Sequence, residues 1–286
     1  MDRALITTGA VLAVAAITYL VSDGPARLRG PHAAASAPAA EAVAAAAVPA
    51  WRRWRVDDRR YEAGEHLPAD ARYRDTVLLV GDSLSIPVGR ALVRDYRQRD
   101  ADTRFVYVGM ESSGLARPDF FDWEALLGAV VGDVRPQRVL IMLGTNDDKP
   151  LRDPAGTTHR FGSGSWAHEY QRRIGALIER ARAGGGDTEV LWVGAPVMRS
   201  AALADAVRVV NETARTGCER LGCRFVDTAS VLAGRDGGFV FSLPDAAGRP
   251  VAVRAKDGVH LQPQGAVRLA RHVRAALEGD GGERRR

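Results

Sequence analysis

The sequence predicts an α/β fold, a three-layer α/β/α sandwich in which a mostly parallel, five-stranded sheet lies between helices. Short apolar runs without strict alternation recur along the chain, as is typical of strands that are buried on both faces. Longer segments between them place apolar residues three and four positions apart, the spacing of amphipathic helices. This alternation of strand and helix predicts a parallel sheet that is covered by helices on both sides.

The expected elements follow one another in chain order. The strands are short and rich in aliphatic and β-branched residues, and they cover residues 76–80, 104–108, 138–143, 189–194 and 224–227. The helices cover residues 84–98, 122–133, 166–183, 202–219 and 263–277. Two further β-rich runs, 239–243 and 250–254, flank the turn-rich PDAAGR and predict a β-hairpin that borders the functional site.

Composition limits the class of protein. The chain has 286 residues, of which 46% are hydrophobic and 26% charged, with a formal net charge of +5. These values are typical of a folded domain and exclude a disulfide-rich miniprotein, a collagen and an acidic disordered chain. Residues 23–60 hold seven basic and four acidic side chains, so the rest of the chain is nearly neutral. We therefore expect no nucleic-acid partner.

The sequence predicts four segments. Residues 1–22 contain an uncharged stretch of 19 residues from 4 to 22, long enough to span a bilayer. Residues 23–60 are a linker rich in Ala, Pro and Arg, residues 61–278 form the folded domain, and residues 279–286 form a disordered tail. Two interpretations of the first segment stay open, an uncleaved anchor and a cleaved signal peptide. With the short end inside, both predict a periplasmic or extracytoplasmic protein, and the anchor adds the inner membrane as a partner.

Two smaller features have two interpretations each. Trp51 and Trp54 stand among arginines, where they can contact an anionic membrane surface or pack on the folded domain. Cys218 and Cys223 are the only cysteines. In an exported protein they can form a disulfide across a short loop, or they can remain small buried thiols.

Unusual polar residues follow the predicted strands. Ser83, in GDSL, opens the helix after the first strand, and Gly114, in SSG, follows the second. Asn146, in GTND, follows the third, and Asp257 and His260, in DGVH, precede the last helix. Ligands of open α/β sheets bind beyond the carboxyl ends of the strands, so we expect these loops to meet at one edge.

These blocks resemble those of the SGNH, or GDSL, hydrolase superfamily, and the resemblance covers about residues 75–278. The second block is the loosest match, because Gly109 competes with Gly114. More narrowly, GDSLSIPVG, SSGLARPDFFDW, LGTNDD, LWVGAPVMR and KDGVHL resemble an exported bacterial branch, domain of unknown function 459. The resemblance implies a flavodoxin-like SGNH hydrolase fold and a serine ester hydrolase.

The resemblance also implies roles for the block residues. Ser83 is the expected nucleophile, His260 the general base, and Asp257 the carboxylate that orients the imidazole. The Ser83 and Gly114 N–H groups and the Asn146 amide are the expected oxyanion hole. Of the six histidines, His260 is the one in a polar loop with a carboxylate three residues upstream. No cofactor and no metal is expected.

The substrate is less closely specified. Residues 147–166 form a long polar loop at the expected edge, which predicts a lid or a selectivity wall. The aromatic residues near the site favour an acylated carbohydrate, with the alternative that they only pack the loops on the core; they are Phe120, Phe121, Trp123, Phe161 and Trp166.

We therefore expect an exported serine esterase that acts on small acyl, chiefly O-acetyl, esters of cell-envelope polysaccharide, by hydrolysis or by acyl transfer. A lipase or thioesterase for longer acyl chains is the nearest alternative. A non-catalytic envelope-binding protein is the alternative from another class.

Overall fold

The computed structural model describes residues 49–53, 61–67, 73–100, 102–185 and 187–279. The chain divides after residue 46 into two units, and the described residues belong to the second. The predicted segment 1–22, most of the linker 23–60 and the tail from residue 280 lie outside them. No helix within the described ranges is long and apolar enough to cross a membrane. The anchor at residues 4–22 therefore stays a prediction.

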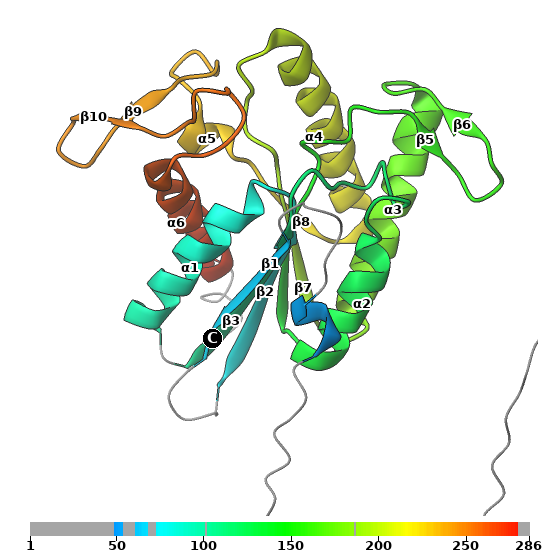
Figure 1. Ribbon diagram of the computed structural model, residues 1–286, viewed down its shortest axis with the longest axis horizontal. Helices are drawn as coiled ribbons and strands as arrows, with labels where there is room; N and C mark the ends of the chain where they lie inside the picture. Colours follow the sequence, from blue (N-terminus) through cyan, green and yellow to red (C-terminus); the bar gives the residue numbers. More distant parts are fainter. Residues whose placement is uncertain (1–48, 54–60, 68–72, 101, 186, 280–286) are drawn as a thin grey trace, which may run out of the picture. The chain divides into compact units, whose positions relative to one another are not determined.

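The five predicted parallel strands are confirmed (Figure 1). They are β2 (Asp75–Gly81), β3 (Thr103–Met110), β4 (Arg138–Met142), β7 (Glu189–Val193) and β8 (Arg224–Val226). They lie in the order β3-β2-β4-β7-β8. Numbered along the chain, this is the order 2-1-3-4-5 of flavodoxin-like sheets, in which the direction of winding reverses between the first and third strands. The loops after β2 and β4 therefore open at the reversal point.

The sheet has a sixth strand, so the prediction of a five-stranded sheet was wrong in number. β1 (Tyr61–His66) pairs antiparallel with β3 at the edge of the sheet. Its sequence, YEAGEH, is polar and its residues are mostly half-buried. An edge strand of this kind lacks the apolar run that marks the buried strands, which is why the sequence pattern missed it.

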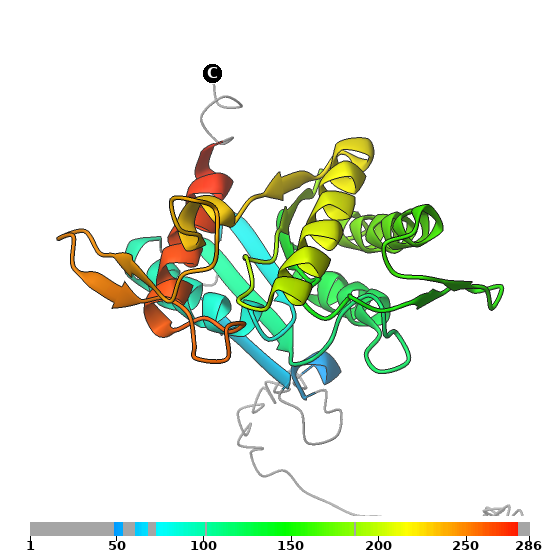
Figure 2. The same ribbon diagram turned by 90° about the horizontal axis from the view of Figure 1, so that it is seen from above.

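Helices cover both faces of the sheet (Figures 1 and 2). One face carries α1 (Ser85–Arg99), α6 (Pro263–Gly279) and the short α5 (Ala229–Leu232), and the other carries α2 (Trp123–Val134), α3 (Gly164–Arg182) and α4 (Ala201–Leu221). Each layer buries its apolar stripe in a separate hydrophobic cluster, one containing Leu92 and Leu269, the other Ile174 and Val210. All five long helices begin and end within two residues of their predicted bounds.

Two short hairpins extend from the sandwich. β9 (Ser242–Pro244) and β10 (Pro250–Ala252) form the predicted hairpin in shorter form. β5 (Leu151–Arg152) and β6 (Thr158–His159) pair within the loop 147–166, where no strand was predicted. Strands of two residues are too short to produce a hydrophobic period, so they leave no signal in the sequence.

The segment before β1 packs on the folded domain. The 3-10 helix η1 (Ala50–Arg53) carries Trp51, which is 3% exposed and lies in the cluster that also holds α2. Its ring N–H donates to the carboxylate of Asp133 at 3.1 Å. For Trp51 the packing interpretation is thus confirmed and the membrane-surface interpretation is wrong, while Trp54 lies outside the described residues.

The two cysteines form a disulfide. Cys218, near the end of α4, is bonded to Cys223, directly before β8. Gly222, between them, ends the helix with φ +67. The bond therefore closes the tight connection between α4 and β8, and the free-thiol interpretation is wrong.

Candidate active site

The four predicted loops lie at one edge of the sheet. Ser83 follows β2 and stands two residues before α1, and Asn146 follows β4 at the reversal point. Gly114 follows β3, and the turn with Asp257 and His260 joins β10 to α6. Because β2, β3 and β4 are parallel, they deliver their carboxyl ends to the same edge, and the contact of His260 with Ser83 places the turn after β10 there as well.

A continuous chain of hydrogen bonds joins three of the predicted residues. The Nε2 atom of His260 lies 3.0 Å from the Oγ atom of Ser83, a residue 177 positions away in the sequence. The other ring nitrogen, Nδ1, lies 2.7 Å from Oδ2 of Asp257. With the ring proton on Nδ1 facing the carboxylate, Nε2 is free to accept the hydroxyl proton of Ser83. The geometry is therefore that of a hydroxyl, a base and an orienting carboxylate.

The turn that carries Asp257 and His260 is held by its own hydrogen bonds. Oδ1 of Asp257 accepts the backbone N–H groups of Val259, at 2.8 Å, and His260, at 3.0 Å. Partial burial opposes ionisation, but the hydrogen bonds from the His260 ring and from these backbone groups outweigh it and lower the pKa of Asp257 to about 2. The carboxylate is therefore charged at neutral pH and able to stabilise an imidazolium.

Arg254 fastens this turn to the loop after β7, a role that sequence reasoning missed. The residue is 2% exposed. Its Nη1 donates to the carbonyl of Val197 at 2.6 Å, and its Nη2 donates to the carbonyl of Val259 at 2.8 Å. Burial lowers the pKa of Arg254 to about 10, because removing the guanidinium from water disfavours its charged form. The hydrogen bonds that join the two loops offset this unfavourable desolvation. Its only sequence signal is a basic residue three positions before Asp257.

The loop after β3 contacts Asn146. The side-chain Nδ2 of Asn146 donates to the carbonyl of Ser113 at 2.8 Å. The Ser113 hydroxyl donates to the carbonyl of Met110 and accepts the ring N–H of Trp123, so this loop is fixed on both sides. Gly109 lies within β3, whereas Gly114 follows Ser113 in the loop. The structure thus places Gly114, and not Gly109, beside Asn146.

Asp147 holds the two residues of this loop that follow Gly114. It is fully buried, and its carboxylate accepts the N–H groups of Leu115, at 3.1 Å, and Ala116, at 2.7 Å, and the hydroxyl of Tyr170, at 2.8 Å. Burial raises the pKa of Asp147 above its ordinary value. A Cβ atom on Gly114 would lie 2.2 Å from Oδ1 of Asp147, so a side chain at that position would displace this carboxylate. The acceptor oxygens of Asp147 therefore serve a loop that lies 31 and 32 positions away in the sequence.

Asp82, next to the predicted nucleophile, does act as a local cap. It is 1% exposed, and its Oδ1 accepts the N–H of Leu84 at 2.9 Å, at the start of α1. Its Oδ2 lies 3.4 Å from the N–H of Thr145 in the loop after β4. Burial, with a smaller contribution from the charge of Asp147, raises the pKa of Asp82 to about 7.

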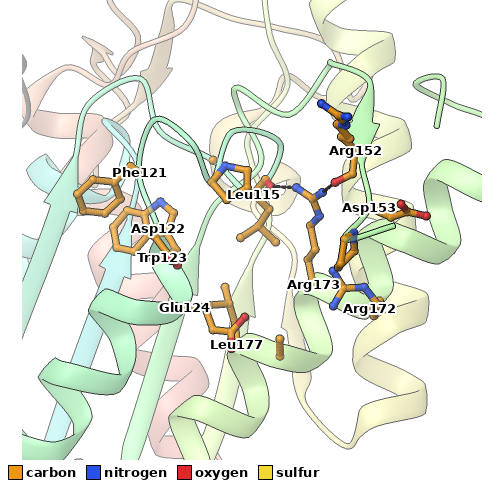
Figure 3. A pocket seen from close by; sticks show the side chains of 14 residues that line it. Leu115, Phe121, Asp122, Trp123, Glu124, Arg152, Asp153, Arg172, Arg173 and Leu177 are labelled. Carbon is orange, nitrogen blue, oxygen red and sulfur yellow. Dashed lines mark hydrogen bonds between the residues drawn. The ribbon is translucent and has the colours of Figure 1, made fainter. Parts of the chain in front are cut away.

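A pocket of about 290 Å³ lies behind the Gly114 loop, between α2 and α3 (Figure 3). Arg173 crosses it and donates to the carbonyls of Leu115 and Arg152, both at 2.5 Å. Of the predicted site residues, only Gly114 lines this pocket. We assign the candidate site to the Ser83–His260 edge, because reactive groups are hydrogen-bonded there, and interpret the pocket as a space beneath one of its loops.

The aromatic residues near the site pack on the core. Trp166, Trp123 and Phe121 are 0%, 2% and 3% exposed, and the ring N–H of Trp166 donates to the carbonyl of Lys149. Phe120 and Phe161 are partly buried against the same cluster. For the three buried rings the packing alternative is therefore confirmed and the expected sugar contact is wrong, while for Phe120 and Phe161 it stays a prediction.

Comparison with models of known protein families identifies one family that matches this chain. A family model described as "Protein of unknown function (DUF459)" matches residues 76–276. The chain belongs to the DUF459 family. The matched range runs from β2 to the last helix and includes every predicted site residue. No curated protein matches the sequence of this DUF459 chain.

Solved structures share the fold of this DUF459 protein. A protein of the lipolytic G-D-S-L family from Desulfitobacterium hafniense has a TM-score of 0.50 at 14% identity, over 70% of this chain and 98% of its own. A GDSL-like lipase structure from Bacteroides ovatus has a TM-score of 0.50 at 13% identity, over 73% and 54%. An aryl esterase of M. smegmatis reaches 0.49 at 17% identity, over 70% and 99%. The two structures with a TM-score of 0.50 share the α/β fold of this chain.

Proposed function

We propose that this DUF459 protein is a serine ester hydrolase with Ser83 as the nucleophile. The observation that carries the proposal is the hydrogen-bonded chain from Ser83 Oγ through the His260 ring to Asp257. A serine hydroxyl is too weak an acid to attack an ester at neutral pH without an adjacent base. A scaffold or binding protein has no use for a serine, an imidazole and a charged carboxylate in this sequence of contacts.

The proposed reaction proceeds through an acyl-serine. His260 Nε2 takes the proton of Ser83 Oγ as the oxygen attacks the carbonyl carbon, and the imidazolium that forms is stabilised by Asp257. His260 then gives that proton to the leaving alcohol, and the ester bond breaks. Water, activated by the same imidazole, releases the acid and restores Ser83. If a sugar hydroxyl replaces the water, the same intermediate leads to acyl transfer.

The oxyanion of the tetrahedral intermediate is proposed to lie among the Ser83 N–H, the Gly114 N–H and the Asn146 amide. Asn146 reaches the Gly114 loop through its bond to Ser113, and Asp147 fixes the next two N–H groups of that loop. The donors are therefore pre-positioned before the substrate binds, which is where most of the stabilisation of such a transition state originates. Losing one donor of this kind costs about 3 to 4 kcal/mol.

We further propose that the substrate is a small acyl ester, chiefly O-acetyl, on a cell-envelope polysaccharide. The side chains of His260 and Asp257 are 48% and 49% exposed, so the reactive groups lie on an open edge that a polymer can approach. The pocket between α2 and α3 is not lined by Ser83, Asp257 or His260, so no acyl site is assigned to it.

We also propose export, with the bulk of the chain outside the cytoplasm. The apolar stretch 4–22 and the Ala- and Pro-rich segment 31–50 support a tethered protein. The disulfide between Cys218 and Cys223 supports an oxidising compartment, because such bonds are rare in the cytosol.

The test uses the full chain purified in detergent and p-nitrophenyl acetate. We expect hydrolysis, and we expect Ser83→Ala to remove it without changing the melting temperature, because Ser83 is partly exposed and packs no core. Ser165→Ala, at an exposed position on α3, is the matched control and keeps the activity. Equal activity of Ser83→Ala and the original chain would overturn the proposal.

Chain-length preference then separates the substrate classes. Faster cleavage of octanoyl than of acetyl esters would favour a lipase or thioesterase over an acetyl esterase. Mass spectrometry of envelope polysaccharide from cells with and without the protein tests the natural substrate. Unchanged O-acetylation would contradict the polysaccharide assignment while leaving the esterase chemistry in place.

A further inference from the structure

Arg199, in the loop after β7, contacts the turn that carries Asp257 and His260, which we call the catalytic turn. The backbone N–H of Arg199 donates to the carbonyl of Gly258 at 3.1 Å, and its Nη1 lies 3.5 Å from the carbonyl of Lys256. Gly258 has φ +77, a backbone conformation that favours glycine, and a Cβ atom there would lie 2.4 Å from the Cβ of Arg199. Both the backbone conformation and the steric overlap therefore exclude a larger residue at this position. Arg199 is thus fixed against the two residues that flank Asp257.

Phe241, from the chain just before β9, lies next to this arginine. It is 42% exposed, although large apolar side chains elsewhere in the described domain are mostly buried. The Arg199 guanidinium carbon lies 5.4 Å from the centre of the Phe241 ring, and the Phe239 ring meets it edge to face at 5.0 Å. The carbonyl of Phe241 accepts the N–H of Val253 at 2.8 Å, which ties this segment to the strand that leads into the catalytic turn. The exposed ring is therefore held in place by its neighbours.

The positive charges at this edge are not neutralised by protein carboxylates. Arg199 and Lys256 are both exposed, and neither forms an ion pair with any residue in the described part of the chain. The carboxylate of Asp257 is occupied by the His260 ring and by two backbone N–H groups. Arg254, buried behind the turn, adds a further positive charge. The surface beside the turn therefore presents two exposed cations, which form no ion pair among the described residues, and one partly exposed aromatic ring.

We propose that Arg199, Lys256 and Phe241 form an acidic-sugar subsite, which binds a carboxylate-bearing sugar of the acylated polysaccharide. Arginine binds a carboxylate through two parallel N–H···O bonds, and a lysine adds a point charge. An aromatic ring packs against the apolar C–H face of a sugar ring. A neutral acyl chain would use neither cation. This subsite rests on the proposed esterase function and narrows its substrate class to acidic glycans.

The test compares two matched substrates with the full chain in detergent. One is a methyl glucuronoside that carries a single O-acetyl group, and the other is the methyl glucoside with its acetyl group at the same position, so that they differ only in the carboxylate. We expect kcat/KM to be about 10- to 100-fold higher for the glucuronoside, through a lower KM, which is the range for a charge-assisted hydrogen bond. Raising the salt to 0.5 M should reduce this preference.

Variants assign the preference to the subsite. Arg199→Gln should bring the ratio of the two kcat/KM values close to 1, whereas Arg97→Gln, an exposed arginine on α1, should leave the ratio unchanged. Phe241→Ala should raise KM for both sugars. Lys256→Gln serves as a second variant if Arg199→Gln does not fold, and it should lower the ratio about threefold. Equal kcat/KM values for the two sugars, or an undiminished ratio in these charge variants, would overturn the proposal.

A binding measurement separates this subsite from the esterase proposal. Ligand-observed NMR with unacetylated methyl glucuronoside requires no turnover. If no ester is cleaved but the original chain binds the sugar and Arg199→Gln does not, the subsite stands and the esterase function fails. If esters are cleaved but the sugar does not bind, the esterase stands and the subsite fails.

Discussion

Substitution of Gly114 by Ala tests the proposed oxyanion loop. A Cβ atom at this position would lie 2.2 Å from Oδ1 of Asp147, whereas nearly all real Cβ contacts are longer than 3.4 Å. The loop or the Asp147 carboxylate must therefore shift by about 1 Å. A misplacement of about 1 Å costs about 100-fold in rate, and loss of an oxyanion donor costs about 10²- to 10³-fold in kcat. We expect Gly114→Ala to lower kcat for p-nitrophenyl acetate by about 100-fold or more, with a much smaller change in KM.

The control for this substitution is Gly132→Ala in α2. A Cβ atom at Gly132 meets no atom within 4 Å, and alanine stabilises a helix interior by up to about 1 kcal/mol relative to glycine. This variant should keep full activity and equal or higher stability. Steady-state kinetics and thermal unfolding of both variants provide the comparison. If folded Gly114→Ala has a kcat within threefold of the original chain, the assignment of Gly114 to the oxyanion hole is refuted.

Three further predictions concern two buried charged residues near the site, Arg254 and Asp82, and the disulfide between Cys218 and Cys223. Arg254→Met should lower kcat about 100-fold with little change in KM. Arg254→Lys should restore part of this kcat, because a lysine can hold only one of the Val197 and Val259 carbonyls well. The control Arg274→Met, at another largely buried arginine, should lower stability alone, and equal losses of kcat in the two Met variants would contradict a positioning role for Arg254. Burial raises the pKa of Asp82 to about 7 from an ordinary value near 4, so the folded state holds a proton that the unfolded chain releases, and the free energy of unfolding should fall as the pH rises from about 4 to 7. Asp82→Asn should remove part of this fall in stability. If the melting temperatures of the original chain and of Asp82→Asn change by the same amount between pH 4 and pH 8, the prediction is contradicted. Replacing Cys218 and Cys223 by Ser should lower the free energy of unfolding by about 2 kcal/mol, because the disulfide closes a short loop, and should leave kcat unchanged; a loss of 5 kcal/mol in denaturant titration would show that the bond does more than close the loop.

The hydrophobic pattern of the sequence predicted most of the strands and helices of the α/β/α sandwich. The residues of β2, β3, β4 and β7 are almost all buried, and each long helix buries one apolar stripe, so hydrophobicity marks both kinds of element. β1 was missed because an edge strand that is half exposed needs no apolar run. β5 and β6 were missed because each strand has two residues, a single period of strand alternation, which is too short to be recognised as a pattern.

The reactive residues were predictable for a different reason. Ser83 and Asn146 stand in short blocks at the ends of parallel strands, and parallel topology brings those ends together, whereas Asp257 and His260 were marked by their spacing in a polar loop before the last helix. Asp147 and Arg254 were not predictable, because their partners are backbone groups of loops far away in the sequence. A backbone N–H or carbonyl leaves no mark in a sequence. Phe121, Trp123 and Trp166 failed as sugar contacts because sequence cannot tell an exposed ring from a packed one, and among the described residues the exposed ring is Phe241.

The central claim is that Ser83 is a nucleophile activated by His260. Treatment of the full chain with a fluorophosphonate, followed by peptide mass spectrometry, measures this directly, because such reagents phosphonylate only activated serines. The account predicts a single adduct on the peptide that contains Ser83, and a rate of labelling about 1,000-fold lower in His260→Ala, within the range of about 10²- to 10⁴-fold for a general base. An adduct on another residue, or undiminished labelling of Ser83 in His260→Ala, would contradict it.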